Sequence, residues 1–295
     1  MTITELTAKA CNKDNFLKPT DYINFAKQYL EYITDNLQAV IVSKNENHYR
    51  FFQYKEEASF NVTRPINSLL MYNFADFEKQ SAEFLKILTD VEANDSEENR
   101  EIINRTIYTA QQCIGATLDA LPANRSNTAR KINGDLFERF IRLIIATVGV
   151  SVTDGTVAIP VKVDDETGFF MKYQHDLIIK VDEEIKAIGS VKTSSKDRID
   201  KIFVDKFLHN KLTEKDTPHF AVFLNDVQRK GADGNYGINS TFLPGHFKGY
   251  TIKLNPLDGV YYCDIRPNML TQNILKDHIK TFDNFLFTDI WKFLR

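Results

Sequence analysis

Two short apolar runs joined by an acidic turn constrain the fold of this chain more than any other feature. The first run, residues 177–179, follows Asp176, and the second, residues 187–191, ends at Lys192. The three acidic residues at 182–184 fit the turn of a hairpin between them. The spacing of 192 − 176 = 16 residues is enough for two strands and a tight turn. We therefore expect the Asp176 carboxylate and the Lys192 ammonium group to approach one cleft from neighbouring strands.

The periodicity of apolar residues predicts two regions of different character. Apolar positions at three- and four-residue spacing predict helices at residues 22–42, 66–91 and 98–118. The rest of the chain reads as a helix at 134–148, strands at 157–163, 174–181, 185–193 and 219–224, a helix at 197–208, and a helix at 271–294. Residues 231–237 read as a glycine-rich loop, and Pro160 restricts the first strand to a sheet edge.

This order of elements predicts an α/β or α+β fold with a central mixed sheet flanked by helices. We expect a helical N-terminal region at residues 1–124, for dimerisation or DNA contacts, and a catalytic domain at residues 125–295. A chain of 295 residues with 43% hydrophobic residues can bury the core that such a fold needs.

Charge and cysteine content exclude several classes of protein. The net charge of −3 means that any nucleic-acid binding must come from a local basic patch. Cys11, Cys113 and Cys263 form no CxxC pair, which suits a reducing compartment. No apolar run approaches the roughly 20 residues that span a bilayer, and residues 1–17 lack the apolar core of a signal peptide. We expect a cytoplasmic protein with no membrane partner.

Asp176 and Lys192 are the residue types that hydrolysis of a phosphodiester requires. Mg²⁺ takes oxygen ligands and usually binds through one or two protein carboxylates. Asp176 at the start of an apolar strand is anchored by its backbone and can hold such an ion. Lys192 can orient the attacking water or stabilise charge on the phosphate. The alternative is that each residue is an ordinary solvated strand end.

Residues 190–198, SVKTSSKDR, resemble the signature of the CCGG- and CCNGG-reading group of type II restriction endonucleases, in the PD-(D/E)xK superfamily. In that group Ser-x-Lys replaces Glu-x-Lys, and a basic residue, an Asp and an Arg open the following helix. A helical Phe-Glu upstream is matched by Phe137 and Glu138. The resemblance covers roughly residues 130–210, and it implies a Mg²⁺-dependent nuclease on a restriction-endonuclease-like core.

Two positions depart from that pattern. His175 stands where the signature usually has Pro, and Ser190 stands where most nucleases have a second carboxylate. The resemblance implies that the missing acid comes from a helix. Asp205, 205 − 192 = 13 residues after the lysine, and Glu138 are the two candidates, and both stay open. Either can instead be a charge on a helix surface.

The basic cluster after Lys192 is a candidate for reading DNA. Arg can donate two hydrogen bonds to guanine, and Asp can accept one from cytosine, so Lys196, Asp197 and Arg198 can read a C·G pair with help from Ser194 and Ser195. The alternative is a helix start with Ser195 as its N-cap. Further candidate DNA contacts are Arg130 and Arg229, each of which can also be a solvated surface residue.

The resemblance implies cleavage of double-stranded DNA at a short, palindromic or nearly palindromic site that contains C·G pairs, leaving 5′-phosphates. Such a site matches a homodimer or a dimer of dimers, with a companion methyltransferase that acts on the same site without being a stable subunit. The rival hypotheses are a structure-specific repair or recombination nuclease, a DNA-binding protein that lost catalysis, and an unrelated small-molecule or structural protein.

Overall fold

The computed structural model describes residues 1–55, 62–163, 166–196, 198–232 and 234–295, without the side chains of residues 166 and 167. The chain divides into two compact units. The N-terminal unit comprises Met1–Ile144 and Asp226–Thr241, and the sheet unit comprises Ile145–Asn225 and Phe242–Arg295. This division differs from the boundary expected at residue 124, because the helix after that residue and the segment at 226–241 both belong mainly to the N-terminal unit.

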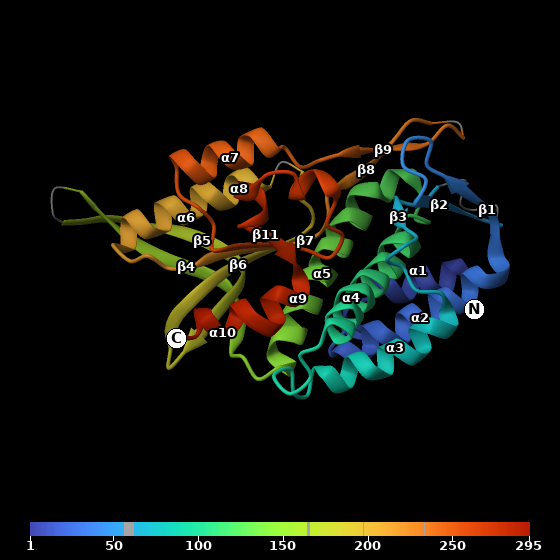
Figure 1. The fold of residues 1–295 in the computed structure, drawn as a ribbon, viewed down its shortest axis with the longest axis horizontal. Coiled ribbons are helices and arrows are strands. Elements are labelled where there is room, and N and C mark those ends of the chain that lie inside the picture. The colour runs from blue at the N-terminus through green and yellow to red at the C-terminus, as the bar shows by residue number, and fades with distance from the viewer. Residues whose placement is uncertain (56–61, 164–165, 197, 233) are drawn as a thin grey trace. The chain divides into compact units, whose positions relative to one another are not determined.

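The N-terminal unit combines helices with a small antiparallel sheet (Figure 1). Its helices are α1 (Ile3–Cys11), α2 (Pro19–Asn36), α3 (Phe74–Ile87), α4 (Glu97–Leu118) and most of α5 (Ser126–Thr147), with short 3₁₀ turns at Lys13–Asn15 and Ala123–Arg125. Its strands are β1 (Leu37–Val42), β2 (Tyr49–Tyr54) and β3 (Ile66–Asn67), hydrogen-bonded in that order, and a separate pair, β8 (Val227–Lys230) and β9 (Gly237–Ser240).

The helix expected at residues 22–42 ends six residues early. Residues 37–42 form β1, which pairs antiparallel with β2. The run Val40-Ile41-Val42 is β-branched and fits a pleated strand better than a helix, and the partner strand completes its hydrogen bonds. The helix expected from residue 66 begins only at Phe74, after the N-cap Asn73. The helix expected at residues 98–118 is confirmed as α4.

The segment expected as a glycine-rich loop, at residues 231–237, connects the two strands of a hairpin. Strands β8 and β9 pair antiparallel on either side of it. Val227 and Ile238 pack against Tyr49 and Phe51 in one buried cluster. The Asn45 amide donates to the Ile238 carbonyl and accepts from the Ile238 N–H, both at 2.9 Å. The hairpin is thereby tied to the N-terminal unit, although segments of the sheet unit flank it in the sequence.

The sheet unit is built on one mixed sheet of six strands, in the order β11-β10-β7-β6-β5-β4. The strands are β4 (Val152–Val163), β5 (Glu166–Val181), β6 (Glu184–Ser194), β7 (His219–Asn225), β10 (Gly259–Tyr262) and β11 (Ile279–Thr281). β6, β7, β10 and β11 pair in parallel, whereas β4, β5 and β6 pair antiparallel. The expected central mixed sheet is confirmed, and β4 with Pro160 lies at its edge.

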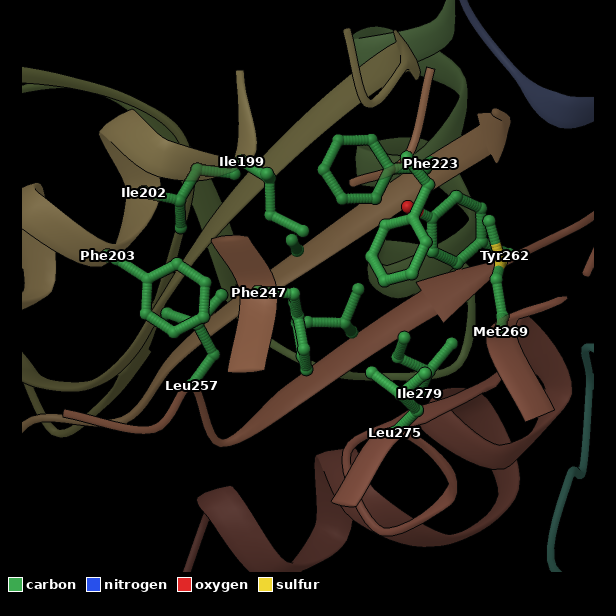
Figure 2. Packing of buried hydrophobic residues seen from close by; sticks show 13 residues of the cluster. Ile199, Ile202, Phe203, Phe223, Phe247, Leu257, Tyr262, Met269, Leu275 and Ile279 are labelled. Atoms are coloured by element: carbon green, nitrogen blue, oxygen red, sulfur yellow. The ribbon is translucent and has the colours of Figure 1, made fainter. Parts of the chain in front are cut away.

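Helices cover both faces of this sheet. α6 (Ile199–Thr213), α7 (Pro244–Lys253) and α8 (Asn273–Lys276) pack on one face with the 3₁₀ turn Pro267–Leu270. Figure 2 shows this core. The ring centres of Phe203 and Phe247 lie 5.6 Å apart on the helices, and those of Phe223 and Tyr262 lie 5.1 Å apart on the strands. Side chains alternate along a strand, so Phe220 points to the other face, where its ring lies 4.7 Å from that of Phe285.

The C-terminal residues do not form the single helix expected at 271–294. They form α8, β11, α9 (Phe282–Asn284), a π-helical turn at Phe285–Asp289 and α10 (Ile290–Phe293). The interruption has a physical cause, since residues 279–281 hydrogen-bond to β10 as a parallel strand. Over the part of the chain that is described, no helix is long and apolar enough to cross a bilayer.

Candidate active site

Strands β5 and β6 separate at Asp176 and form a fork in the sheet. Their described pairing runs from the turn to Leu177, which faces Gly189. Beyond that point β6 continues along β7 as far as Ser194, whereas β5 continues along β4. The opposite end of the hairpin is closed by Asp182 and Glu183, with φ angles of 49° and 65°. The acidic turn expected from the sequence is therefore confirmed, and the other end is open.

The Asp176 carboxylate lies at this fork and bonds to β6 through one oxygen. Its Oδ2 accepts a hydrogen bond of 2.8 Å from the Val191 N–H and one of 2.5 Å from Lys192 Nζ. The carboxylate takes the place of a strand partner for the Val191 N–H, which would otherwise be unpaired at the fork. The side chains of Asp176 and Lys192 are 16% and 30% exposed. The two residues expected to meet are in direct contact and within reach of solvent.

A β-bulge lies beside Asp176. β4 pairs Thr153 with Ile178 but Gly155 with His175, so β5 has one more residue than β4 in the interval that holds Asp176 and Leu177. Gly155 has a φ of 146°, which L side chains rarely adopt. Bulges bend a strand and re-aim its side chains, and they are frequent next to active sites. The local backbone thus sets the direction of the Asp176 side chain.

The other candidate site residues, Ser190, Asp205 and Glu138, lie on three different elements. Ser190 is half-buried on β6, at the position that pairs with Ala221 of β7 in the sheet register. Asp205 lies on α6, where its Oδ2 is 2.5 Å from Lys201 Nζ, one helical turn away. Glu138 is half-buried on α5 within the N-terminal unit. Which of Glu138 and Asp205 joins Asp176 stays a prediction.

The Asp176 carboxylate can offer one oxygen as a ligand to a hard cation. Both hydrogen bonds fall on Oδ2, and the described chain places no donor on Oδ1. A free carboxylate oxygen is the ligand that Mg²⁺ prefers, with water and phosphate completing its shell. Among the described side chains, no three His, Cys, Asp or Glu groups converge as a metal site. Asp176 can therefore supply one protein ligand, and the side chains that the structure describes form no full protein cage around it.

The segment after Lys192 is where the sequence places its candidate DNA contacts. Lys196 and Arg198 are exposed, and Ser195 is buried. The N-cap of α6 is Arg198, without a side-chain cap, so Ser195 as N-cap is wrong. Ser194 Oγ accepts from the Lys196 N–H at 3.2 Å, which tightens the turn. Asp197 lies outside the described residues.

The two further basic candidates belong to the N-terminal unit. Arg130 is exposed on α5, with its Nη1 at 3.2 Å from Asn127 Oδ1. Arg229 on β8 donates to the Val62 carbonyl, and its guanidinium lies 5.6 Å from the centre of the Tyr236 ring. Arg229 is exposed and contacts residues of its own unit, and a DNA contact by either residue stays a prediction.

Three histidines that are scattered in the sequence come together beside this site. His175 on β5, His209 on α6 and His219 on β7 are all buried, with ring centres 6.3 Å apart for His175 and His219 and 5.1 Å apart for His209 and His219. Burial lowers the pKa of His175 to about 4 and that of His219 to about 3, and it also lowers the pKa of His209. His175 and His219 are therefore neutral at pH 7. No spacing in the sequence signals this cluster, because each residue comes from a different element.

Buried polar residues also gather where the parallel strands end. Ser194 pairs in the register with Asn225 at the end of β7, and the Asp264 N–H donates to the Leu224 carbonyl at 3.0 Å. Asn225 and Asp264 are 6% and 2% exposed. The carboxyl ends of parallel strands meet at one sheet edge, so these residues belong to the same edge as Lys192. Asp264 was not among the predicted site residues, although its place directly after an apolar run was a usable signal.

Comparison with known proteins identifies the fold. No family model and no curated protein matches the sequence. The crystal structure of the type IIP restriction endonuclease Kpn2I matches with a TM-score of 0.74 and 20% identity, over 99% of this chain and 97% of that chain. The restriction endonuclease PspGI, in a complex with substrate DNA, matches with a TM-score of 0.46 and 14% identity, over 75% of this chain and 90% of that chain. The chain has a restriction-endonuclease-like α+β fold with a central mixed sheet.

Proposed function

We propose that this chain is a type II restriction endonuclease, which hydrolyses double-stranded DNA at a short, C·G-containing palindromic or nearly palindromic site in the presence of Mg²⁺. One observation carries the proposal: Asp176 and Lys192 meet at the fork of β5 and β6, where the described residues place no donor on the second Asp176 oxygen. The fold shared with Kpn2I supports it, and so does the SVKTSSKDR segment at residues 190–198.

The roles of the residues follow from their chemistry. Asp176, with Glu138 or Asp205, would hold Mg²⁺, which supplies Lewis-acid stabilisation of the phosphate charge and activates water. Lys192 would orient the attacking water and offset the charge that grows on the phosphate oxygens. The Asp176 contact holds the Lys192 ammonium group in place before DNA arrives. In-line attack would leave 5′-phosphates.

Recognition would come from the turn that opens α6. Lys196, Asp197 and Arg198 would read C·G pairs in the major groove, where each good bidentate contact discriminates by about 1–3 kcal/mol. Ser194, Ser195, Arg130 and Arg229 are the further candidates for DNA contacts. A palindromic site is matched by a homodimer or a dimer of dimers, and a companion methyltransferase would protect the same site in the cell.

The test is cleavage of unmethylated phage DNA with Mg²⁺ and with EDTA. We expect discrete fragments from the unaltered protein with Mg²⁺ only, and none from Lys192→Ala. Lys186→Ala is the matched control, because Lys186 lies on the same strand near the closed end of the hairpin, paired with Glu184 at 2.7 Å. Fragments from Lys186→Ala but not from Lys192→Ala would support the proposal, and the fragment ends would identify the site.

Two other outcomes correspond to rival functions. Ser190, in the position where most nucleases have an acid, favours a DNA-binding protein without catalysis, which would bind one sequence with or without Mg²⁺ and cut nothing. A smear of products, or cleavage only at branched or single-stranded junctions, would indicate a repair or recombination nuclease. The absence of salt-dependent DNA binding would contradict all nucleic-acid functions.

A further inference from the structure

A cavity of about 380 Å³ lies over one face of the small sheet in the N-terminal unit. β2 contributes Arg50 and Phe52, which stand two residues apart on the strand and therefore point to the same face. Their partners in the sheet register, Ile66 of β3 and Val40 of β1, also line the cavity. Residues of α2 and of the segment at 68–74 form the remaining walls. The volume is in the range of small-molecule sites, about 300–1,000 Å³.

The wall at residues 68–74 is held in place by α4. The Tyr72 N–H donates a hydrogen bond to Thr109 Oγ1 at 3.0 Å, and the Leu70 carbonyl accepts one from Arg105 Nε at 3.2 Å. The Arg105 guanidinium also lies 4.0 Å from the centre of the Tyr72 ring, as a cation–π contact. The cavity is thus formed before any ligand binds, which lowers the conformational entropy that binding costs.

The lining of the cavity combines aromatic rings with one positive charge. Phe52, Tyr72 and Phe74 contribute the rings, and of the described residues that line the cavity only Arg50 is charged. Aromatic faces and edges pack favourably against another aromatic ring. The lining therefore favours a ligand with an aromatic body, and the position of Arg50 determines where a charged group of that ligand would lie.

Arg50 has no acidic partner in the described part of the chain. Its Nη1 lies 3.4 Å from the Tyr49 carbonyl oxygen, and no described carboxylate is within ion-pair distance. Three other arginines of the same unit, Arg64, Arg100 and Arg105, each contact an acidic side chain, at 2.8, 2.6 and 2.9 Å. Arg50 is half-buried, so water compensates its charge only in part. A guanidinium in this setting can donate two parallel hydrogen bonds to a carboxylate.

We propose that this cavity binds a small aryl carboxylate, with its aromatic ring among the three lining rings and its carboxylate on Arg50. One guanidinium balances one negative charge, which suits a monocarboxylate better than a doubly charged phosphate. All residues of this site belong to the N-terminal unit, whereas the candidate active site at Asp176 belongs to the sheet unit. Binding at this site is therefore independent of the proposed nuclease function.

The experiment is isothermal titration calorimetry of the full chain, without DNA or Mg²⁺. The probe is 3-phenylpropionate, and its neutral match is 3-phenylpropanamide, which has the same ring and chain but an uncharged head group. The test variant is Arg50→Gln, which removes the guanidinium and keeps a flexible polar side chain. The control is Arg125→Gln, at an exposed arginine of the same unit that does not line the cavity. Circular dichroism checks that both variants fold.

We expect saturable binding of 3-phenylpropionate by the unaltered protein and by Arg125→Gln. Binding should be at least about tenfold weaker for the amide and for Arg50→Gln, because each change removes one side of the charge-assisted hydrogen bonds. No saturable binding of the carboxylate, equal binding of the amide, unchanged binding by Arg50→Gln, or an equal weakening in Arg125→Gln would each overturn the proposal. If Arg50→Gln does not fold, the comparison of carboxylate and amide on the unaltered protein decides.

Discussion

Two pairs of an aspartate and a cation, one in each unit, differ in how fully the carboxylate is used. In the N-terminal unit, Asp119 Oδ2 accepts from the Arg64 main-chain N–H at 2.7 Å and from Nε at 2.9 Å, and Oδ1 accepts from Nη2 at 2.8 Å. In the sheet unit, both bonds to Asp176 fall on Oδ2. The exposures are similar, at 20% and 22% for Arg64 and Asp119 and 16% and 30% for Asp176 and Lys192. The number of bonds on each oxygen therefore separates the two pairs more clearly than burial does.

The first pair is built for stability. A bidentate guanidinium uses both carboxylate oxygens in a fixed geometry, and Gly115 leaves the space for it, since a Cβ there would lie 2.3 Å from Arg64 Nη1. In the second pair, the described residues place no hydrogen bond on the other oxygen of Asp176, which under the proposed function would bind Mg²⁺. This difference predicts that changes at the two aspartates have opposite consequences.

The largest expected effect is on DNA cleavage in Asp176→Asn. Loss of the carboxylate charge should lower the cleavage rate by about 10²–10⁴-fold, while the stability changes by less than about 1 kcal/mol for a partly exposed pair. Single-turnover cleavage and urea unfolding measure the two effects. Asp119→Asn is the matched control, with the opposite expectation of lower stability and retained cleavage per folded molecule. Equal losses of cleavage in both variants would remove the distinction.

Arg64→Ala tests the structural pair from its other side. We expect a loss of about 2–3 kcal/mol, less than the 3–5 kcal/mol of a fully buried pair because both side chains remain partly exposed. Arg100→Ala is a suitable control, since Arg100 also contacts an aspartate through two nitrogens, at 2.6 and 2.8 Å, but its partner Asp95 is 40% exposed. There the loss should stay below about 1 kcal/mol. A similar midpoint of urea unfolding for both variants would contradict the assignment.

The comparison also shows which parts of the structure the sequence could predict. Asp176 and Lys192 belong to adjacent strands of one hairpin, so apolar runs, an acidic turn and a 16-residue spacing were enough to bring them together. Arg64 and Asp119 are 55 residues apart and meet only through the packing of a loop on α4. Nothing local in the sequence signals that contact.

The same limit explains the errors in the fold. Residues 37–42 and 279–281 carry helix-compatible patterns, and strand partners from elsewhere decide their conformation. The segment at 226–241 packs with Tyr49 and Phe51, which no periodicity of its own could indicate. The cluster of His175, His209 and His219 is assembled from two strands and a helix. Most of the missed features depend on contacts between distant segments, and the β1–β2 hairpin was missed because apolar residues of β1 continue the helical spacing of α2. The β5–β6 hairpin was predicted because its two apolar runs and acidic turn lie close together in the sequence.

Acid should destabilise the sheet unit through the buried His219, independently of both aspartate pairs. His219 has a pKa of about 3 when folded, below the value near 6.5 expected when unfolded. The unfolded chain therefore binds more protons, so this stability is complete above pH 6.5 and declines as the pH falls towards 3. Burial is the main cause of this low pKa, the hydrogen bond with the Thr217 carbonyl opposes it, and positive charge on His209, His175 or Lys206 lowers the pKa further. From pH 6.5 to 5, His219 alone should cost about 1.5 kcal/mol.

The measurement is urea unfolding of the unaltered protein and of His219→Gln at several pH values. The variant should have a shallower loss of stability with acid, even if its stability at pH 7.5 is lower. Identical slopes would show that burial of His219 does not contribute. Arg64→Ala should retain the slope of the unaltered protein, which would separate the titration from the structural pair.

The smallest expected change in stability is at Asp205, and it sharpens the question of what completes the site at Asp176. Asp205 and Lys201 form a pair one turn apart on α6, so Asp205→Asn and Lys201→Gln should each cost about 0.3–0.5 kcal/mol. If Asp205 supplies the second carboxylate, only Asp205→Asn should raise the Mg²⁺ concentration for half-maximal cleavage. We expect that split, because Lys201→Gln removes the same pair and keeps the acid. Superimposable Mg²⁺ curves for the two variants would show that Asp205 is only a charge on the helix surface. Glu138→Gln would then be the variant that needs a higher Mg²⁺ concentration for cleavage.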